Sequence, residues 1–211
     1  MLKKLNNLQI RDRLTRAFIT VACILTLVSA VILITMIIMS RVYAATVVDY
    51  GFAQGDIGRA MAQFADTRSA MRGIIGYDDQ DAIDTLLINR NTYKESFTKE
   101  FNSLESAMVT AENKKLYNDL KSKLADYWVL EEEIINQGAT TDREQCKLAQ
   151  DKALGDLAPM YNEIYDELTQ IMDIKVEKGQ QVSSLLTMIV IGLTVIIIVI
   201  ITISIIFALS L

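Results

Sequence analysis

Two long stretches without a charged side chain constrain this 211-residue chain more than any other feature. The first is residues 17–40, and the second begins after Lys178 and continues to the last residue. A helix needs about 20 residues to cross the hydrocarbon core of a bilayer, so both stretches are long enough to span a membrane. We therefore predict four parts, in chain order: a cytoplasmic N-terminal segment (1–16), a transmembrane helix (17–40), an extracytoplasmic domain (41–181) and a second transmembrane helix (182–211).

The basic residues beside the first stretch predict its orientation. Five of them precede residue 17, whereas only Arg41 follows closely, and basic residues next to a span stay in the cytoplasm. We expect a multi-pass protein of the plasma membrane with a cytoplasmic N-terminus. A cleaved signal peptide, with residues 42–44 as the cleavage site, is the alternative. It fits less well because the apolar core of a signal peptide is only about 7–15 residues long.

Charge and composition exclude several classes of function for the segment between the two stretches. It carries 16 basic and 25 acidic residues, a net charge of −9, so nucleic acid is not expected as a partner. The chain has no histidine, the usual general base and the commonest zinc ligand. No nucleophile motif, metal-ligand cluster or glycine-rich phosphate loop is present in the sequence. We therefore predict that the protein is not an enzyme and that it holds no cofactor or metal.

Helical periodicity runs through nearly all of segment 41–181, where apolar residues recur every three or four positions. Turn signals near residues 77–80, 110 and 138–140 divide it into four helices. The first and fourth helices continue into the uncharged stretches without an obvious break, so their ends must meet at the membrane. The short turns then predict an all-α fold, an antiparallel up-down-up-down four-helix bundle flanked by two transmembrane helices.

Local signals add detail to this bundle. Thr110 is expected to cap the third helix, and Thr141 begins a capping box with Glu144 at the start of the fourth. Pro159 should bend the fourth helix. We expect Glu131 and its two glutamate neighbours on a solvated face and Cys146 as a surface thiol. The predicted core positions are Ile57, Met61, Phe64, Arg68, Met71 and Ile75 on the first helix, and Leu154, Leu157, Tyr161, Ile164, Leu168 and Ile171 on the fourth.

Arg68 is the anomaly in this pattern, because it occupies a core position and a buried guanidinium needs a partner. Arg72 follows one helical turn later, and the two together could bind a carboxylate. Salt bridges to nearby carboxylates are the alternative. The residues that could form them are Asp66, Asp84 and Glu144. Other polar residues lie at a similar level of the bundle, namely Arg90, Lys94, Lys147 and Gln150. Small residues form a stripe beside Arg72 that suits a homodimer contact, namely Gly58, Ala62, Ala65, Ser69 and Gly76.

Further motifs connect the chain to a known family. A basic amphipathic segment (7–14) precedes the first span, Asp66-Thr67-Arg68 lies late in the first helix, and Ala158-Pro159-Met160-Tyr161 lies in the fourth. With the two spans, these features resemble the four-helix-bundle sensor module of methyl-accepting chemotaxis proteins over almost the whole chain. The same module also precedes histidine kinases and cyclic-dinucleotide enzymes.

The resemblance implies a homodimer that binds a small molecule near the far end of the dimer interface and signals by sliding the fourth helix. By position it assigns Arg68 and Arg72 on the first helix, and Thr141, Gln145 and Ala149 on the fourth, to ligand binding. Arg90 joins the candidates because it lies at the same level.

A membrane sensor is the function that these observations favour. We expect a transmembrane chemosensory input module that binds an extracytoplasmic small molecule, with a carboxylate or other anionic group, and signals by displacing the second span. A scaffold that pairs with full-length receptors, or the sensor part of a histidine kinase, are the alternatives. No cytoplasmic output domain is expected within this sequence, whether the gene is truncated, only a piece of the protein is given, or the protein lacks such a domain.

Overall fold

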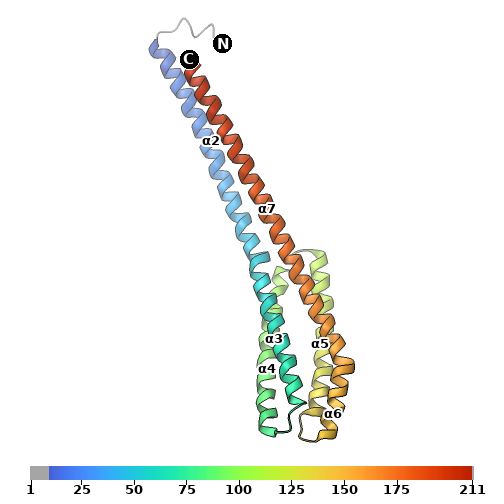
Figure 1. Cartoon of the computed structure of the whole chain (residues 1–211). Helices are drawn as coiled ribbons and strands as arrows, with labels where there is room; N and C mark the ends of the chain where they lie inside the picture. Colours follow the sequence, from blue (N-terminus) through green and yellow to red (C-terminus); the bar gives the residue numbers. More distant parts are fainter. Residues whose placement is uncertain (1–9, 211) are drawn as a thin grey trace. The chain divides into compact units, whose positions relative to one another are not determined.

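The computed structural model describes residues 10–210, and its elements are helical (Figure 1). In chain order they are α2 (Ile10–Thr46), the π-helix η1 (Val47–Phe52), α3 (Ala53–Ile74), α4 (Gln80–Ser103), the 3₁₀ helix η2 (Leu104–Ala107), α5 (Ala111–Gly138), α6 (Arg143–Lys152), the π-helix η3 (Ala153–Leu157) and α7 (Ala158–Ser210). The turns that separate α3, α4, α5 and α6 lie where the sequence predicts them.

The chain divides into two compact units. One is Thr46–Gly179, in which α3, α4, α5 and the leg made of α6, η3 and the first part of α7 run alternately up and down as a four-helix bundle. The predicted all-α four-helix bundle is therefore confirmed. The other unit contains the described residues up to Ala45 and those from Gln180 onward. The first nine residues of the predicted segment 1–16 lie outside the described residues.

The helices of the second unit are the apolar ones. The most apolar windows have a mean hydropathy of 2.9 in the helix that contains α2 and 3.3 in the helix that contains α7. Hardly any of these residues is buried within the protein. By length and composition alone, both helices could cross a membrane.

An aromatic cluster fills the middle of the bundle and joins its four legs. The ring of Phe64 on α3 stacks on Tyr161 of α7, with 4.7 Å between centroids, and lies 5.0 Å from Tyr127 and 5.7 Å from Trp128 on α5. Phe97 contributes from α4, 5.3 Å from Phe64. Aromatic pairs at these separations add to the stability gained by burial alone.

The core positions of α3 differ in part from the predicted ones. The sequence favours Met61 and Arg68, but both are half-buried, and Ala60 and Thr67 are fully buried in their place. Small side chains here allow the neighbouring helices to approach closely. Thr67 is tolerated in the core because its hydroxyl donates to the carbonyl oxygen of Gln63 at 2.8 Å. Arg68 therefore lies at the edge of the core.

The fourth leg departs from prediction at both its cap and its core face. Asp142, not Thr141, caps α6, because its carboxylate accepts the amide of Glu144 at 2.9 Å. The π turn η3 ends two residues before Pro159, whose ring would clash with the carbonyl of a regular α-helical turn. The extra residue of the π turn rotates the helix face, so Ala153 is buried and Leu154 is 71% exposed. The cap of Thr110 is as predicted, since its hydroxyl accepts the amide of Asn113.

Two further expectations about exposure are wrong. Glu131 is fully buried rather than solvated, because one of three consecutive helical residues must face the core, and Arg90 on α4 neutralises it there. Cys146 is also buried, and its thiol donates to the carbonyl oxygen of Thr140 at 3.0 Å. Both residues help to pack the bundle.

Candidate functional site

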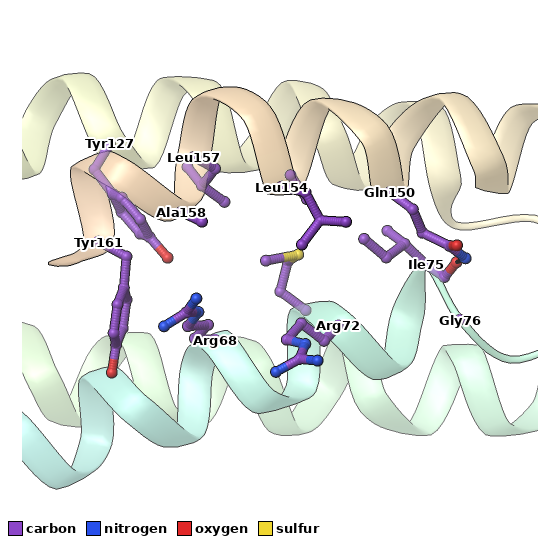
Figure 2. A pocket seen from close by; sticks show the side chains of 12 residues that line it. Arg68, Arg72, Ile75, Gly76, Tyr127, Gln150, Leu154, Leu157, Ala158 and Tyr161 are labelled. Atoms are coloured by element: carbon purple, nitrogen blue, oxygen red, sulfur yellow. Dashed lines mark hydrogen bonds between the residues drawn. The ribbon is translucent and has the colours of Figure 1, made fainter.

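A cavity of about 370 Å³ opens between α3 and the fourth leg, and α5 contributes one residue to its wall (Figure 2). It lies toward the end of the bundle formed by the α3–α4 and α5–α6 turns. Its volume falls at the lower end of the range for small-molecule sites, about 300–1,000 Å³. The residues that line it are Arg68, Met71, Arg72, Ile75, Gly76, Tyr127, Gln150, Ala153, Leu154, Leu157, Ala158 and Tyr161.

The two arginines give this cavity its charge. The guanidinium carbon of Arg68 lies 3.9 Å from the centroid of the Tyr161 ring, a cation–π contact that covers one face of the group. The N–H groups at the edge of Arg68 can still donate to a ligand. Arg72 is exposed at the cavity. Among residues 10–210, neither arginine forms an ion pair with a carboxylate.

The alternative of structural salt bridges from these arginines therefore does not hold in the described part of the chain. Asp84, one of the three carboxylates considered, instead accepts a hydrogen bond from Gln80 at 2.9 Å. Arg68 and Arg72 have donors available at a cavity, which is the arrangement that binds an anion.

The hydroxyl of Tyr127 is the second notable polar group of the cavity. Tyr127 is fully buried, and its hydroxyl has no hydrogen-bond partner among the described residues. Figure 2 shows the hydroxyl directed toward the end of the cavity that holds Arg68. Burial, and secondarily the charge of Glu131, raises the pKa of the Tyr127 phenol. The hydroxyl therefore remains a neutral hydrogen-bond donor at physiological pH.

Gln150 closes the opposite end of the cavity. Its side-chain amide nitrogen donates to the carbonyl oxygen of Ile75 at 2.7 Å, so it fastens α6 to the C-terminal end of α3. Among the described lining residues none is acidic, and the remaining wall is largely apolar. The cavity thus combines two cations, neutral donors and an apolar surface.

Arg90, a predicted ligand-binding residue, does not line the cavity. Its guanidinium pairs with buried Glu131 and lies 3.0 Å from a carboxylate oxygen of Glu132. Burial raises the pKa of Glu131 to about 6, although Arg90 acts in the opposite direction. Lys94 lies 4.8 Å from the ring centroid of Trp128, and burial, followed by the charge of Arg90, lowers the pKa of Lys94. Arg90 is therefore a partner within the bundle, and we leave it out of the site.

Gln145 and Ala149 also lie away from the cavity lining. Gln145 is exposed in the first turn of α6, where its backbone N–H donates to the capping carboxylate of Asp142 at 3.4 Å. Ala149 is fully buried beneath Gly138, so close that a methyl group added to the glycine would come within 2.6 Å of the Ala149 side chain. Thr141 is exposed and does not line the cavity either.

Sequence reasoning missed the roles of Tyr127 and Leu154. Leu154 is among the predicted core positions of the fourth helix, and Tyr127 is not among the predicted site residues. The hydroxyl of Tyr127 was the available signal, since a buried phenol needs a hydrogen-bond partner. Pro159 indicated a distortion of the fourth helix, but it did not predict that the distortion is a π turn that exposes Leu154 at the cavity.

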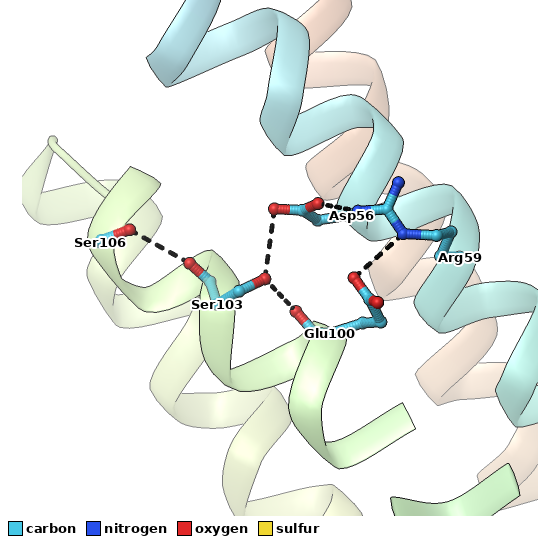
Figure 3. Close-up of polar contacts among 5 residues, drawn as sticks. All are labelled: Asp56, Arg59, Glu100, Ser103 and Ser106. Carbon is cyan, nitrogen blue, oxygen red and sulfur yellow. Dashed lines mark hydrogen bonds and ion pairs between the residues drawn. The ribbon is translucent and has the colours of Figure 1, made fainter. Parts of the chain in front are cut away.

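A second polar cluster joins α3 to α4 away from the cavity (Figure 3). Arg59 pairs with Asp56 on its own helix and donates to Glu100 of α4 at 3.1 Å. Ser103 contacts Asp56 at 3.2 Å. The side chain of Arg59 is 59% exposed, and exposed ion pairs contribute only about 0–1 kcal/mol each. This cluster has its charges paired, which distinguishes it from the cavity.

The four legs of the bundle carry a cavity, and comparison with known families identifies the class of this bundle. Residues 7–187 match a family described as the four helix bundle sensory module for signal transduction. The match covers most of the chain, so the chain belongs to this family, a class of signalling input modules that is typically non-catalytic. No curated protein and no solved structure is significantly similar to the chain. Among residues 10–210, no group of three or more side chains gathers as a metal site.

Proposed function

We propose that the chain is the input module of a transmembrane chemosensory receptor of the methyl-accepting chemotaxis type. It binds a small anionic molecule in the cavity beside Arg68 and Arg72. The observation that supports this most is the pairing state of these two guanidiniums. They lie at a cavity with no carboxylate partner among the described residues, whereas Arg59 and Arg90 in the same bundle are paired. An anionic ligand supplies the missing charge.

The signal travels along α7. This helix contributes Ala158 and Tyr161 to the cavity and continues as one helix to Ser210. The same helix therefore contains part of the cavity wall and also the second apolar stretch. A ligand that contacts α3 on one side and α7 on the other favours one relative position of the two helices. It shifts the equilibrium only by its difference in affinity between the two positions.

The proposed setting is the plasma membrane, with α2 and α7 spanning it and the bundle outside the cell. The two apolar helices support this, together with the five basic residues before residue 17. A cysteine at Glu144, an exposed position on α6, should react with a membrane-impermeant maleimide in intact cells when Cys23 and Cys146 are replaced. Protection of this cysteine in intact cells, with labelling only after lysis, would reverse the topology.

Ligand binding is tested with the full chain in lipid nanodiscs. A thermal-shift screen against amino acids, organic acids, amines and inorganic phosphate should find an anion that raises the melting temperature, because a ligand that binds only the folded state stabilises it. Arg68→Ala should remove the shift. Arg59→Ala is the matched control, since it removes an arginine from the same helix that is already paired.

The melting temperature without ligand decides between the two roles of Arg68. We expect it to change by only a few degrees in Arg68→Ala, because alanine favours the helix and no ion pair is broken. A strongly destabilised variant that keeps the ligand shift would make Arg68 a structural residue and the proposed site wrong.

A further inference from the structure

We infer that the ligand of this cavity is an organic carboxylate with an apolar body and no ammonium group, hydrogen-bonded by Tyr127. This assignment rests on the proposed function, since it names the class of anion that the same cavity takes. Hydroxy and oxo acids of metabolite size belong to this class, whereas the corresponding amino acids do not.

Charge excludes an ammonium group. Arg68 and Arg72 supply two positive charges, and none of the described lining residues is acidic. An ammonium group in this cavity would therefore lie near two like charges, and none of the described lining residues has a carboxylate to pair with it. One or two carboxylates, by contrast, find a bidentate donor at each guanidinium.

The buried hydroxyl of Tyr127 can donate a hydrogen bond to an oxygen on the ligand. It is fully buried without a partner among the described residues, and it points into the cavity. A hydroxyl buried in this way loses its hydrogen bonds to bulk water and recovers one when an acceptor arrives. A carboxylate, hydroxyl or oxo group can accept this hydrogen bond. An ammonium group could only donate to the phenol oxygen, which would place it at the end of the cavity that holds the positive charge of Arg68.

The apolar wall requires a carbon body. Met71, Ile75 and Leu157 form part of the lining, and Leu154 is 71% exposed at the cavity. A ligand with an apolar body covers Leu154 and removes this surface from water. Inorganic phosphate or sulfate would pair with the arginines but leave the apolar wall exposed.

Matched pairs of compounds test the ligand class. The full chain in nanodiscs is titrated by calorimetry with 3-phenyllactate against phenylalanine, 2-hydroxy-4-methylpentanoate against leucine, malate against aspartate, and inorganic phosphate alone. Each pair keeps the carbon skeleton and exchanges a hydroxyl for an ammonium group. At least one hydroxy acid should bind at least about tenfold more tightly than its amino partner and than phosphate, a difference of about 1.4 kcal/mol.

The outcomes separate the ligand class from the proposed function. An amino acid or phosphate that binds as tightly as any hydroxy acid, and loses binding in Arg68→Ala, overturns the ligand class and leaves the sensor function standing. If none of these compounds binds at concentrations up to about 10 mM, which is above the ordinary range of metabolite affinities, the ligand class fails. The proposed function fails as well if no anion in the thermal-shift screen raises the melting temperature.

Tyr127→Phe tests the hydrogen bond separately. We expect affinity for the hydroxy acid to fall by about three- to tenfold, because one hydrogen bond is lost. The melting temperature of the free chain should stay the same or rise, because an unpartnered buried hydroxyl is removed.

Tyr117→Phe is the matched control. Tyr117 is also buried on α5, but its hydroxyl donates to the carbonyl oxygen of Phe101 at 3.3 Å. This variant should melt at a lower temperature and keep its affinity. If Tyr127→Phe behaved like Tyr117→Phe, Tyr127 would be a packing residue with no part in binding.

Discussion

The ammonium group of Lys175 is buried inside the bundle and donates a hydrogen bond to the carbonyl oxygen of Ala107, a residue in the η2 turn. It also donates to the carbonyl oxygen of Asp49 in the π-helix η1 at 3.2 Å and lies 5.4 Å from the ring centroid of Tyr50. Burial lowers the pKa of Lys175, while the charge of Asp49 raises it. One side chain of α7 thus connects η1 and η2 to this helix.

Two substitutions separate the packing of Lys175 from its hydrogen bonds. Lys175→Ala removes a fully buried chain of methylene groups and should lower the free energy of unfolding by about 2–4 kcal/mol. Lys175→Met keeps the volume but leaves the carbonyl of Ala107 without its donor, which costs about 1–3 kcal/mol and is partly offset by removal of a buried charge. The methionine variant should therefore be the more stable of the two.

Urea unfolding measures both variants, with the fluorescence of Trp128, the single tryptophan of the chain, as the probe. A methionine variant more stable than the wild type would show that the two hydrogen bonds do not compensate for burying the charge. Equal losses for both variants would show that the aliphatic stem contributes nothing.

Glu131 should make the stability of the bundle depend on pH. Its pKa is raised from an ordinary value of 4.5 to about 6 in the folded chain, so the folded state binds the proton more tightly than the unfolded state. The resulting stability is fully present below pH 4.5 and is lost as the pH rises through 6. A difference of this size corresponds to about 2 kcal/mol.

Comparison with Glu131→Gln isolates this effect from other titrating groups. The free energy of unfolding of the wild type minus that of the variant should rise by about 2 kcal/mol as the pH falls from above 6 to below 4.5. Glu132→Gln is the control, because it removes the half-exposed partner of Arg90 and keeps the buried one. A difference between wild type and Glu131→Gln that stays flat with pH would contradict a carboxylate whose pKa is raised by burial.

The contact between Gly138 and α6 should not tolerate a methyl group. An added Cβ would lie 2.6 Å from that of Ala149 and 2.7 Å from a methyl carbon of Ile75. Gly138→Ala should therefore destabilise the bundle by about 1–3 kcal/mol through overpacking.

Gly155→Ala provides the comparison, since nothing lies within 4 Å of a Cβ there. It should be neutral or stabilise the helix by up to about 1 kcal/mol. Equal effects of the two substitutions on the urea midpoint would mean that the close approach at Gly138 is not maintained in solution.

A homodimer through α3 is a further prediction. The small-residue stripe defined above is partly exposed on the surface of the bundle, where Ser69 and Ala62 are its exposed members on α3. Ser69→Cys, in a chain with Cys23 and Cys146 replaced, should form a disulfide-linked dimer under mild oxidation in membranes. Val129→Cys on α5 is the control, at a position that is 71% exposed. Crosslinking through position 129 but not position 69 would rule out this interface.

Apolar spacing and turn residues were sufficient to predict the bundle. Helical periodicity depends on local geometry, so the sequence was sufficient to predict the four legs and the cap of Thr110. The arginine pair could also be found, because a charge among apolar positions stands out in the sequence. Both Arg68 and Arg72 do line one cavity.

Tertiary structure alone decided which of these charges are neutralised. Arg90 and Arg68 look alike in the sequence, yet Arg90 meets Glu131, 41 residues away on another helix, and Arg68 meets the ring of Tyr161. The partner of a charge depends on the rotation of each helix about its axis. On the fourth leg the π turn before Pro159 changes that rotation, and on α3 the face turned to the core carries Ala60 and Thr67 in place of Met61 and Arg68. Side-chain packing sets such rotations jointly across all four helices, so the sequence determined the bundle and only its packing determined the cavity.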